Sequence, residues 1–170
     1  YSFHSYNLFK TASFTGLENY KYILGDKLII KAFIQTFKYA FLTVPLELMF
    51  ALFIAYILNN KIRGLNFFRT IYYIPSILGG SVSIAVLWKF LFKTEGLVNI
   101  MLGALGIPAF NWLGNPDGAF FVIVLLRVWQ FGSPMVIFLA ALKGVQGDLY
   151  EAAAIDGCSP AGTFFKIVVP

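Results

Sequence analysis

The sequence predicts an all-α membrane protein, a bundle of transmembrane helices, and two observations carry this prediction. Apolar residues make up 59% of the 170 residues and charged residues only 12%, whereas a soluble domain carries about 25% charged residues. Three apolar runs, at about 32–58, 71–92 and 120–142, each reach the roughly 20 residues that a helix needs to cross a bilayer. A soluble helical bundle is the alternative, but three such runs would leave it almost no polar face.

Each predicted span contains residues that weaken a helix. In a membrane such residues let two helix backbones approach closely, or allow a kink around a cavity. Close packing and the lining of a solute pathway are therefore both open interpretations for them. They are Pro45 in the first span, Pro75, Gly79, Gly80, Ser81 and Ser83 in the second, and Gly132, Ser133 and Pro134 in the third.

Four charged residues lie inside the predicted spans, where charges are costly and often functional. Lys38 and Lys89 are close enough to a span end for their ammonium groups to reach the boundary. Glu47 and Arg127 lie deeper and on different spans, so we expect them to make polar contacts inside the bundle. A packing ion pair and a part in the solute pathway are both compatible with this expectation.

The loops between the spans differ in charge. Residues 59–70 contain three basic residues and no acid, whereas residues 93–119 are nearly neutral. The positive-inside tendency places the basic loop in the cytoplasm, so that the third span runs inward. The lysines within residues 1–31 weigh against this orientation, although acids partly offset them. Trp88 and Trp112 then fall near the outer boundary, where amphipathic rings prefer to lie.

The segment after the third span contains the start and stop signals of two short helices. Asp148 is placed to cap the first helix, with Glu151 three residues further on at capping-box spacing. Gly157 suits the left-handed residue that ends such a helix. Ser159 can cap a second helix whose first position is Pro160. An alanine-rich helix of this kind either docks into a groove on another protein or is an ordinary surface helix.

The motif EAAAIDG, followed after nine residues by IVVP, resembles the EAA loop of ABC-importer permeases. That loop contains Glu-Ala-Ala, a Gly four residues after the second Ala, and then Ile-x-Leu-Pro. Six positions match in residue type and spacing, and Val169 stands where Leu is usual. The matching residues are Glu151, Ala152, Ala153, Gly157, Ile167 and Pro170.

Two further segments are similar to the sugar-type branch of these permeases, which includes the maltose and glycerol-phosphate importers. TGLENYKYIL at 15–24 resembles the segment after that branch's first span, and RGLNFFRTIYYIP at 63–75 resembles its basic loop and following span. The resemblance covers essentially all 170 residues. It implies a single transmembrane permease domain over residues 1–170, as a fragment that lacks the first span and the final spans of the family.

The resemblance implies a multi-pass subunit in the inner or plasma membrane of a prokaryote. Its expected partners are a second permease subunit, cytoplasmic ATPase subunits, an extracytoplasmic solute-binding protein and membrane lipid, but no nucleic acid. The loop at about 148–170 would be the coupling helix, seated in a groove of the ATPase. The expected coupling residues are Leu149, Tyr150, Glu151, Ala152, Ala153, Asp156, Gly157, Ser159, Ile167 and Pro170.

Energy for transport would have to come from the partners. The sequence has no G-x-x-x-x-G-K-[ST] phosphate loop, so we expect this chain to bind no cofactor and the ATPase subunits to bind ATP and Mg²⁺. One cysteine and one histidine, Cys158 and His4, supply neither a catalytic set nor a metal site. We therefore expect a transporter subunit and not an enzyme. An intramembrane enzyme and a passive helical channel or structural bundle are the alternative classes.

The solute is expected to be a sugar or a sugar-like molecule, on the strength of the resemblance. Walls that bind sugars combine aromatic faces with hydroxyl and amide groups. A glycerol-phosphate ester is a second possibility, in which Arg127 would meet the phosphate. The candidate pathway residues are Glu47, Tyr73, Ser81, Ser83, Arg127, Trp129, Gln130 and Ser133.

Overall fold

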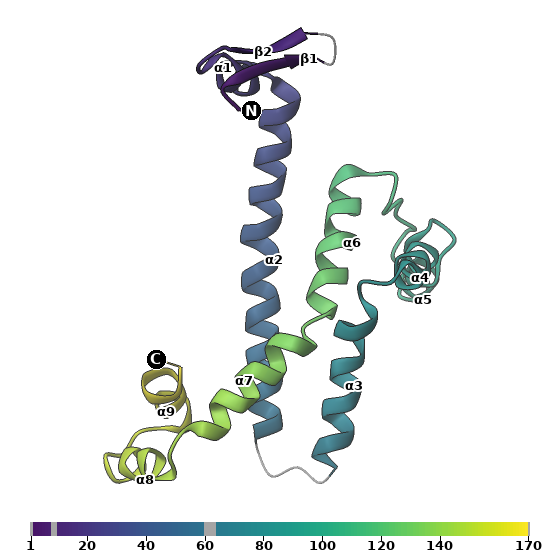
Figure 1. Ribbon diagram of the computed structural model, residues 1–170. Helices are drawn as coiled ribbons and strands as arrows, with labels where there is room; N and C mark the ends of the chain where they lie inside the picture. The colour runs from purple at the N-terminus through teal and green to yellow at the C-terminus, as the bar shows by residue number, and fades with distance from the viewer. Residues whose placement is uncertain (1, 8–9, 60–63, 170) are drawn as a thin grey trace. The chain divides into compact units, whose positions relative to one another are not determined.

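The computed structural model describes residues 2–7, 10–59 and 64–169 and divides into two units. The first unit is Tyr1–Leu42 and the second is Thr43–Pro170, and each is described by itself. Figure 1 shows the order of the helices and strands. Pro170, one of the predicted coupling residues, lies outside the described residues, as do residues 60–63 of the predicted basic loop.

The first unit begins with a hairpin that the sequence analysis did not predict. Strands β1 (His4–Asn7) and β2 (Lys10–Phe14) pair antiparallel, with His4 opposite Phe14. Helix α1 (Glu18–Gly25) follows, and the Asn19 amide donates hydrogen bonds to the carbonyl oxygens of Ser2 and His4 at 2.9 and 3.1 Å. The amide therefore ties α1 to the hairpin.

Helix α2 (Lys27–Asn59) runs from the first unit into the second and is 33 residues long. Within the described residues it is the single helix that is long and apolar enough to cross a membrane unaided. Pro45 lies inside it without ending it. In the second unit α2 buries one stripe at a spacing of three to four residues, as a helix face requires. That stripe is Thr43, Glu47, Ala51, Ala55 and Leu58.

The other two apolar runs are broken helices. In the second run α3 (Leu65–Leu78) is followed by α4 (Val82–Phe92), and the chain bends by 97° between Phe67–Leu78 and Val82–Ala104. In the third run α6 (Pro116–Trp129) is followed by α7 (Gly132–Gly144), with a bend of 41°. By length and composition, the described residues hold up to three spans if each bent pair counts as one.

The apolar run at 71–92 predicts one crossing, and its sequence does not predict so sharp a bend. The structure ends α3 at Leu78 and begins α4 after Ser81, whose hydroxyl accepts a hydrogen bond from the Ile84 N–H at 3.4 Å. Gly79 and Gly80 between them restrict the backbone least. A serine N-cap directly after two glycines therefore starts a new helix in a new direction.

Helix α7 packs against α2 to form the core of the second unit. The α2 side of this contact is small, because Ala51 and Ala55 are both 0% exposed. Large side chains of α7 fill the space that the alanines leave, and Met135 is also fully buried. The core consists of Ala51, Ala55, Leu58, Phe131, Met135, Leu139 and Leu142.

Polar and aromatic contacts fix the loop between α4 and α6. Helix α5 (Leu97–Ala104) carries Asn99, which is 5% exposed. Its amide nitrogen donates to the carbonyl oxygens of Thr94 and Phe110 at 2.9 and 2.8 Å, and its amide oxygen accepts from the Phe110 N–H and the Trp112 indole at 3.2 and 2.9 Å. A buried amide with all these bonds satisfied holds three separate parts of the loop together.

Candidate functional site

The two helix breaks of the second unit lie against each other. Helix α3 packs on α7, and a Cβ at Gly132 would lie 2.6 Å from the Tyr72 carbonyl oxygen and 2.9 Å from the Tyr73 Cα. Only a glycine permits this approach of backbone to backbone. The Gln130 side chain covers Gly79, where a Cβ would lie 2.1 Å from the Gln130 Cδ. The break after α3 and the break after α6 are therefore in direct contact.

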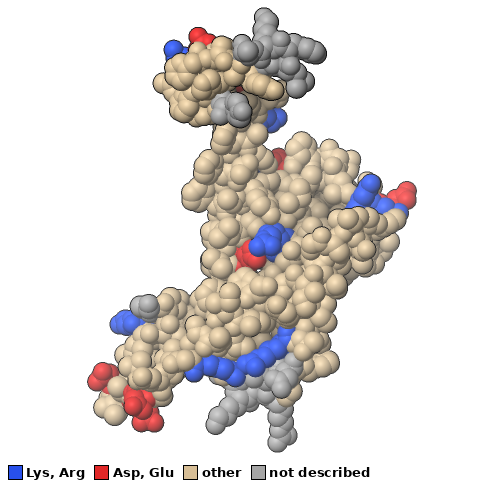
Figure 2. Space-filling model, in the orientation of Figure 1, with Lys and Arg blue, Asp and Glu red and all other residues tan. Residues whose placement is uncertain are grey.

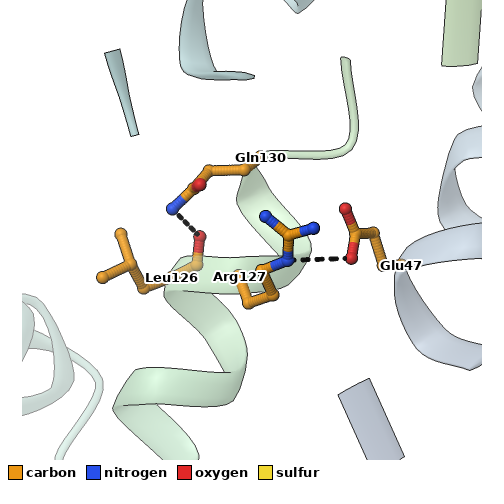
Figure 3. Close-up of polar contacts among 4 residues, drawn as sticks. All are labelled: Glu47, Leu126, Arg127 and Gln130. Atoms are coloured by element: carbon orange, nitrogen blue, oxygen red, sulfur yellow. Dashed lines mark hydrogen bonds and ion pairs between the residues drawn. The ribbon is translucent and has the colours of Figure 1, made fainter. Parts of the chain in front are cut away.

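An ion pair joins α2 to the end of α6. The Arg127 Nε lies 3.1 Å from Glu47 Oε2, and the side chains are 49% and 7% exposed respectively (Figure 3). The expectation that these two residues make polar contacts inside the bundle is confirmed. One partner is nearly buried, so the pair stabilises the fold chiefly by leaving no lone charge among apolar helices.

Gln130 lies one turn beyond this ion pair and closes α6. Its side-chain amide donates to the Leu126 carbonyl oxygen at 3.2 Å (Figure 3). Its backbone N–H donates to the Arg127 carbonyl oxygen at 3.0 Å. These bonds use carbonyl oxygens that the broken helix would otherwise leave without a partner. The same side chain thus completes the helix end and touches the opposite break at Gly79.

A cluster of aromatic rings lies beside the break after α6. Trp129, the last residue of α6, contacts Trp88 in a tilted arrangement with ring centroids 5.3 Å apart. The Trp88 indole N–H donates to the Val122 carbonyl oxygen at 3.2 Å, which joins α4 to α6. Trp88 and Trp112 also each contact Phe92. The two tryptophans predicted for the outer boundary therefore belong to one cluster with Trp129.

The structure gathers some candidate pathway residues and leaves others apart. Glu47, Arg127, Trp129 and Gln130 lie around the end of α6, and Ser133 follows directly on Gly132. Ser81 caps α4, and the side chains of Ser83 and Tyr73 are exposed. Sequence reasoning missed Ser76, whose hydroxyl donates to the Tyr73 carbonyl oxygen at 2.8 Å and adjoins Gly132.

A second candidate surface is the segment after α7. Helix α8 (Gly147–Ile155) begins two residues earlier than predicted, with Gln146 at its N-cap and no side-chain cap bond. The predicted cap at Asp148 and its capping box with Glu151 are therefore wrong. Asp148 instead lies in the first helical turn, where its carboxylate still interacts favourably with the positive helix end.

The end of α8 follows the prediction. Gly157 has a φ of 71°, a left-handed conformation that favours glycine. The N–H groups of Gly157 and Cys158 donate to the carbonyl oxygens of Ala154 and Ala153 at 3.1 and 2.9 Å, which is a Schellman motif.

The second short helix is only partly as predicted. Ser159 accepts from the Gly162 N–H at 3.1 Å, and α9 (Pro160–Thr163) then begins at Pro160 as predicted. The following residues continue as a π-helical turn, η1 (Phe164–Val168), instead of an α-helix.

Helix α8 has a packed side and an open side. Ala153, one of the expected coupling residues, is 2% exposed. Its side chain therefore packs against its own chain and does not lie on the outward face of α8. Leu149 and Ile155 are 46% and 87% exposed, and Glu151 is exposed. In Figure 2 acidic side chains gather over this end of the chain. The open side therefore combines exposed apolar side chains with negative charge.

A pocket of about 330 Å³ lies behind α8. Tyr150 and Ala154 line it from α8, so the predicted coupling residue Tyr150 faces this pocket. Tyr56 of α2 also lines it and makes an edge contact to Phe164, with ring centroids 4.7 Å apart. The remaining lining residues are Asn59, Leu142, Cys158, Pro160, Thr163, Phe164 and Val168.

Solved structures share this fold. A bacterial ABC transporter involved in the import of the acidic polysaccharide alginate matches 91% of this chain and 55% of its own, with a TM-score of 0.79 and 22% identity. The alginate ABC transporter in complex with its alginate pentasaccharide-bound periplasmic protein gives a TM-score of 0.78 at the same identity and the same coverage. The predicted all-α membrane fold of an ABC importer permease is confirmed.

Sequence relatives define the family. The probable ABC transporter permease protein YesP of Bacillus subtilis is 45% identical over 171 residues, which cover 99% of this chain and 55% of the relative. The trehalose/maltose permease MalF of Thermococcus litoralis is 37% identical over 92% of this chain and 54% of the relative. The sn-glycerol-3-phosphate permease UgpA of Salmonella typhimurium is 36% identical over 100% of this chain and 58% of the relative. No family model matches.

The fold and these relatives define an integral membrane permease of the ABC transporter class. The chain belongs to the family of sugar-type ABC importer permeases, and it spans about half the length of the curated relatives it matches. The resemblance that the EAA motif and the flanking segments suggested is confirmed at the level of the family.

Replacing Gly132 by Ala is expected to lower the stability of the chain by about 1–3 kcal/mol, since the new Cβ would meet the α3 backbone and force the helices apart. Thermal unfolding of the purified subunit in detergent measures this loss. Gly144→Ala is the matched control, because no atom lies within 4 Å of a Cβ at that end of α7. Equal stability of the two variants would contradict the close packing of α3 and α7.

Replacing Arg127 by Gln is expected to destabilise the chain more than the double change Glu47→Gln with Arg127→Gln. The single change leaves the nearly buried Glu47 carboxylate without its partner, a situation that typically costs about 3–5 kcal/mol. A double-mutant cycle of thermal stability measures the difference. If the double variant were as unstable as the sum of the single variants, the ion pair would not be coupled.

Proposed function

We propose that this chain is part of a permease subunit in an ATP-driven, binding-protein-dependent importer of sugars or sugar-like solutes. The curated relatives are named as permeases for such solutes, and the structural match is to an importer solved with a periplasmic binding protein. The proposed setting is the inner or plasma membrane of a prokaryote. The proposed partners are a second permease subunit, cytoplasmic ATPase subunits that bind ATP and Mg²⁺, and a solute-binding protein.

The observation that carries the proposal is the open side of α8. Leu149 and Ile155 expose apolar surface beside Glu151 on a helix that the Schellman motif ends at Gly157. An apolar side chain that is 87% exposed gains free energy when a partner covers it. The negative charge of Glu151 favours a groove with a basic group. These features support α8 as the coupling helix of the EAA loop.

The linkage between α8 and the spans suggests how motion would pass. Helix α7 ends at Gly144 and α8 begins at Gly147, so only Val145 and Gln146 separate them, both in extended conformation. A tilt imposed on α8 by closing ATPase subunits would pull directly on α7. The other end of α7 is the break at Gln130, which contacts the break at Gly79. We infer that these two adjacent breaks are where the bundle changes between outward-open and inward-open states.

The ion pair bears on which solute would pass. The Glu47 carboxylate already pairs with the Nε of Arg127 and neutralises its charge. A phosphate ester would have to compete with this carboxylate, whereas a neutral sugar would meet rings and amides at Trp129 and Gln130. The arrangement therefore favours an uncharged carbohydrate over a glycerol-phosphate ester, and Ser81, Ser83, Tyr73 and Ser133 stay candidates for its hydroxyl contacts.

Replacing Ile155 by Ser is expected to weaken assembly with the ATPase subunits by about 10- to 150-fold, because burying such a side chain typically contributes about 1.5–3 kcal/mol. Affinity capture of the ATPase subunits by the complete permease, together with solute uptake, measures the effect. Ile100→Ser on α5 is the control, since Ile100 is 63% exposed and lies on the loop before α6. Full assembly and uptake in the Ile155→Ser variant would contradict the docking role of α8.

Replacing Gln130 by Leu is expected to lower sugar uptake by about 2- to 12-fold if its amide also bonds the passing solute, the range that one neutral hydrogen bond contributes. Proteoliposomes that contain the complete transporter, its binding protein and ATP allow uptake of neutral sugars and glycerol phosphate to be compared. Import of glycerol phosphate that depends on Arg127, with no import of neutral sugar, would overturn the proposed solute class.

A further inference from the structure

Two cations and an apolar strip line a pocket that plays no part in the proposed transport. The pocket holds about 250 Å³ at the end of the bundle where α3 begins and α7 ends. Arg69 of α3 and Lys143 of α7 form its charged part, and Val136, Leu139 and Ala140 of α7 form its apolar part. Figure 2 shows a band of basic side chains across this end of the second unit.

The positive charge of this pocket has no acid beside it in the sequence. Neither residues 48–94 nor residues 118–147, which carry Arg69 and Lys143, contain an Asp or a Glu. Glu47, the acid just before the first stretch, is paired with Arg127. The pocket is therefore suited to an anion from outside the described chain.

Arg69 itself needs a hydrogen-bond acceptor. Its Nε is buried and has no hydrogen-bond partner within residues 2–7, 10–59 and 64–169. A buried N–H without an acceptor is unfavourable, and a guanidinium fork matches the oxygens of a phosphate. An ammonium such as that of Lys143 adds charge from the other side. Arg69 and Lys143 therefore bring two cationic groups to the same pocket.

The apolar strip decides which phosphate compound fits. Val136 lies seven residues before Lys143 on α7, so the strip extends about 10 Å along the helix toward the middle of the span. A free phosphate or an acidic side chain of a soluble subunit would use only the cations. A lipid uses both parts, because its headgroup meets the charges at the boundary while an acyl chain lies along the helix.

We propose that Arg69 and Lys143 bind the phosphate of an anionic phospholipid headgroup, with an acyl chain along Val136, Leu139 and Ala140. The site goes beyond the proposed transport function. It lies at the same end of α7 as α8, because α8 starts three residues after α7 ends. A bound lipid would thus hold the ends of α3 and α7 together next to the proposed coupling helix. Anionic lipids attract basic residues at the membrane surface.

The test uses the complete transporter in phosphatidylcholine nanodiscs, titrated with phosphatidylglycerol and followed by native mass spectrometry. The double variant Arg69→Gln with Lys143→Gln is expected to bind phosphatidylglycerol about 30-fold more weakly, given the usual contribution of each basic residue near an anionic membrane surface. The single variant Arg69→Lys keeps the positive charge but lacks the two parallel N–H donors of a guanidinium. It is expected to bind phosphatidylglycerol more strongly than the double variant but more weakly than the unchanged transporter.

The control removes the same charge from a similar pocket. Lys89 and Lys93 line a pocket of about 350 Å³ with Val86, Phe90 and Leu113, and the Lys93 Nζ lies 5.6 Å from the centroid of the Phe90 ring. The two ammonium groups differ from the Arg69 Nε, because neither is among the buried atoms of the described residues that lack a hydrogen-bond partner. The double variant Lys89→Gln with Lys93→Gln is expected to bind phosphatidylglycerol as the unchanged transporter does. Equal losses in both double variants would show general surface attraction and overturn the site.

Three further outcomes would also overturn the proposal. One is unchanged binding of phosphatidylglycerol by the Arg69→Gln, Lys143→Gln variant. Another is full displacement of the lipid by millimolar inorganic phosphate, which would make it a free-anion site. The third is loss of the ATPase subunits from this variant in pure phosphatidylcholine, which would make it a protein contact. Lipid binding is measured without transport, so a transporter that binds lipid at this site but imports no solute would contradict only the proposed function.

Discussion

Helix α7 is held on two sides by contacts that small residues make possible. On one side Ala51 and Ala55 of α2 leave room for Met135, and on the other Gly132 lets the backbone of α3 approach. Lipid chains are as apolar as leucine, so helices in a membrane gain little from hydrophobicity alone and associate through such close packing. The adjacent breaks, the ion pair and the placement of α8 all depend on the position of α7.

The polar side chains beside the break after α6 are paired within the fold. Glu47 is nearly buried and meets Arg127, and Gln130 occupies carbonyl oxygens at the end of α6. An unpaired backbone group costs several kcal/mol in hydrocarbon, so a broken helix in a membrane needs such substitutes. The side chains at the break therefore have a structural role, which is to pair polar groups of the broken helix. Their proposed contact with a solute is a second role, added to groups that the fold already requires.

Sequence reasoning reached the features that leave a local or periodic signal. Long apolar runs predicted the spans, isolated deep charges predicted the Glu47–Arg127 contact, and Gly157 with Ser159 predicted the turn after α8. It failed where tertiary contacts decide. The sharp bend after Leu78, the fourfold bonding of Asn99 and the inward side of Ala153 depend on distant partners. Asp148 satisfied the capping pattern, yet the N-cap of the helix is Gln146, two residues earlier.

The aromatic cluster beside the breaks has an optical consequence. The chain contains three tryptophans, and all of them, Trp88, Trp112 and Trp129, belong to that cluster. Trp129 is the last residue of α6 and is linked by ring contact to Trp88 of α4. The ultraviolet emission of these described residues therefore originates from one small region next to the break. Rearrangement there would change the colour and intensity of that emission without any attached dye.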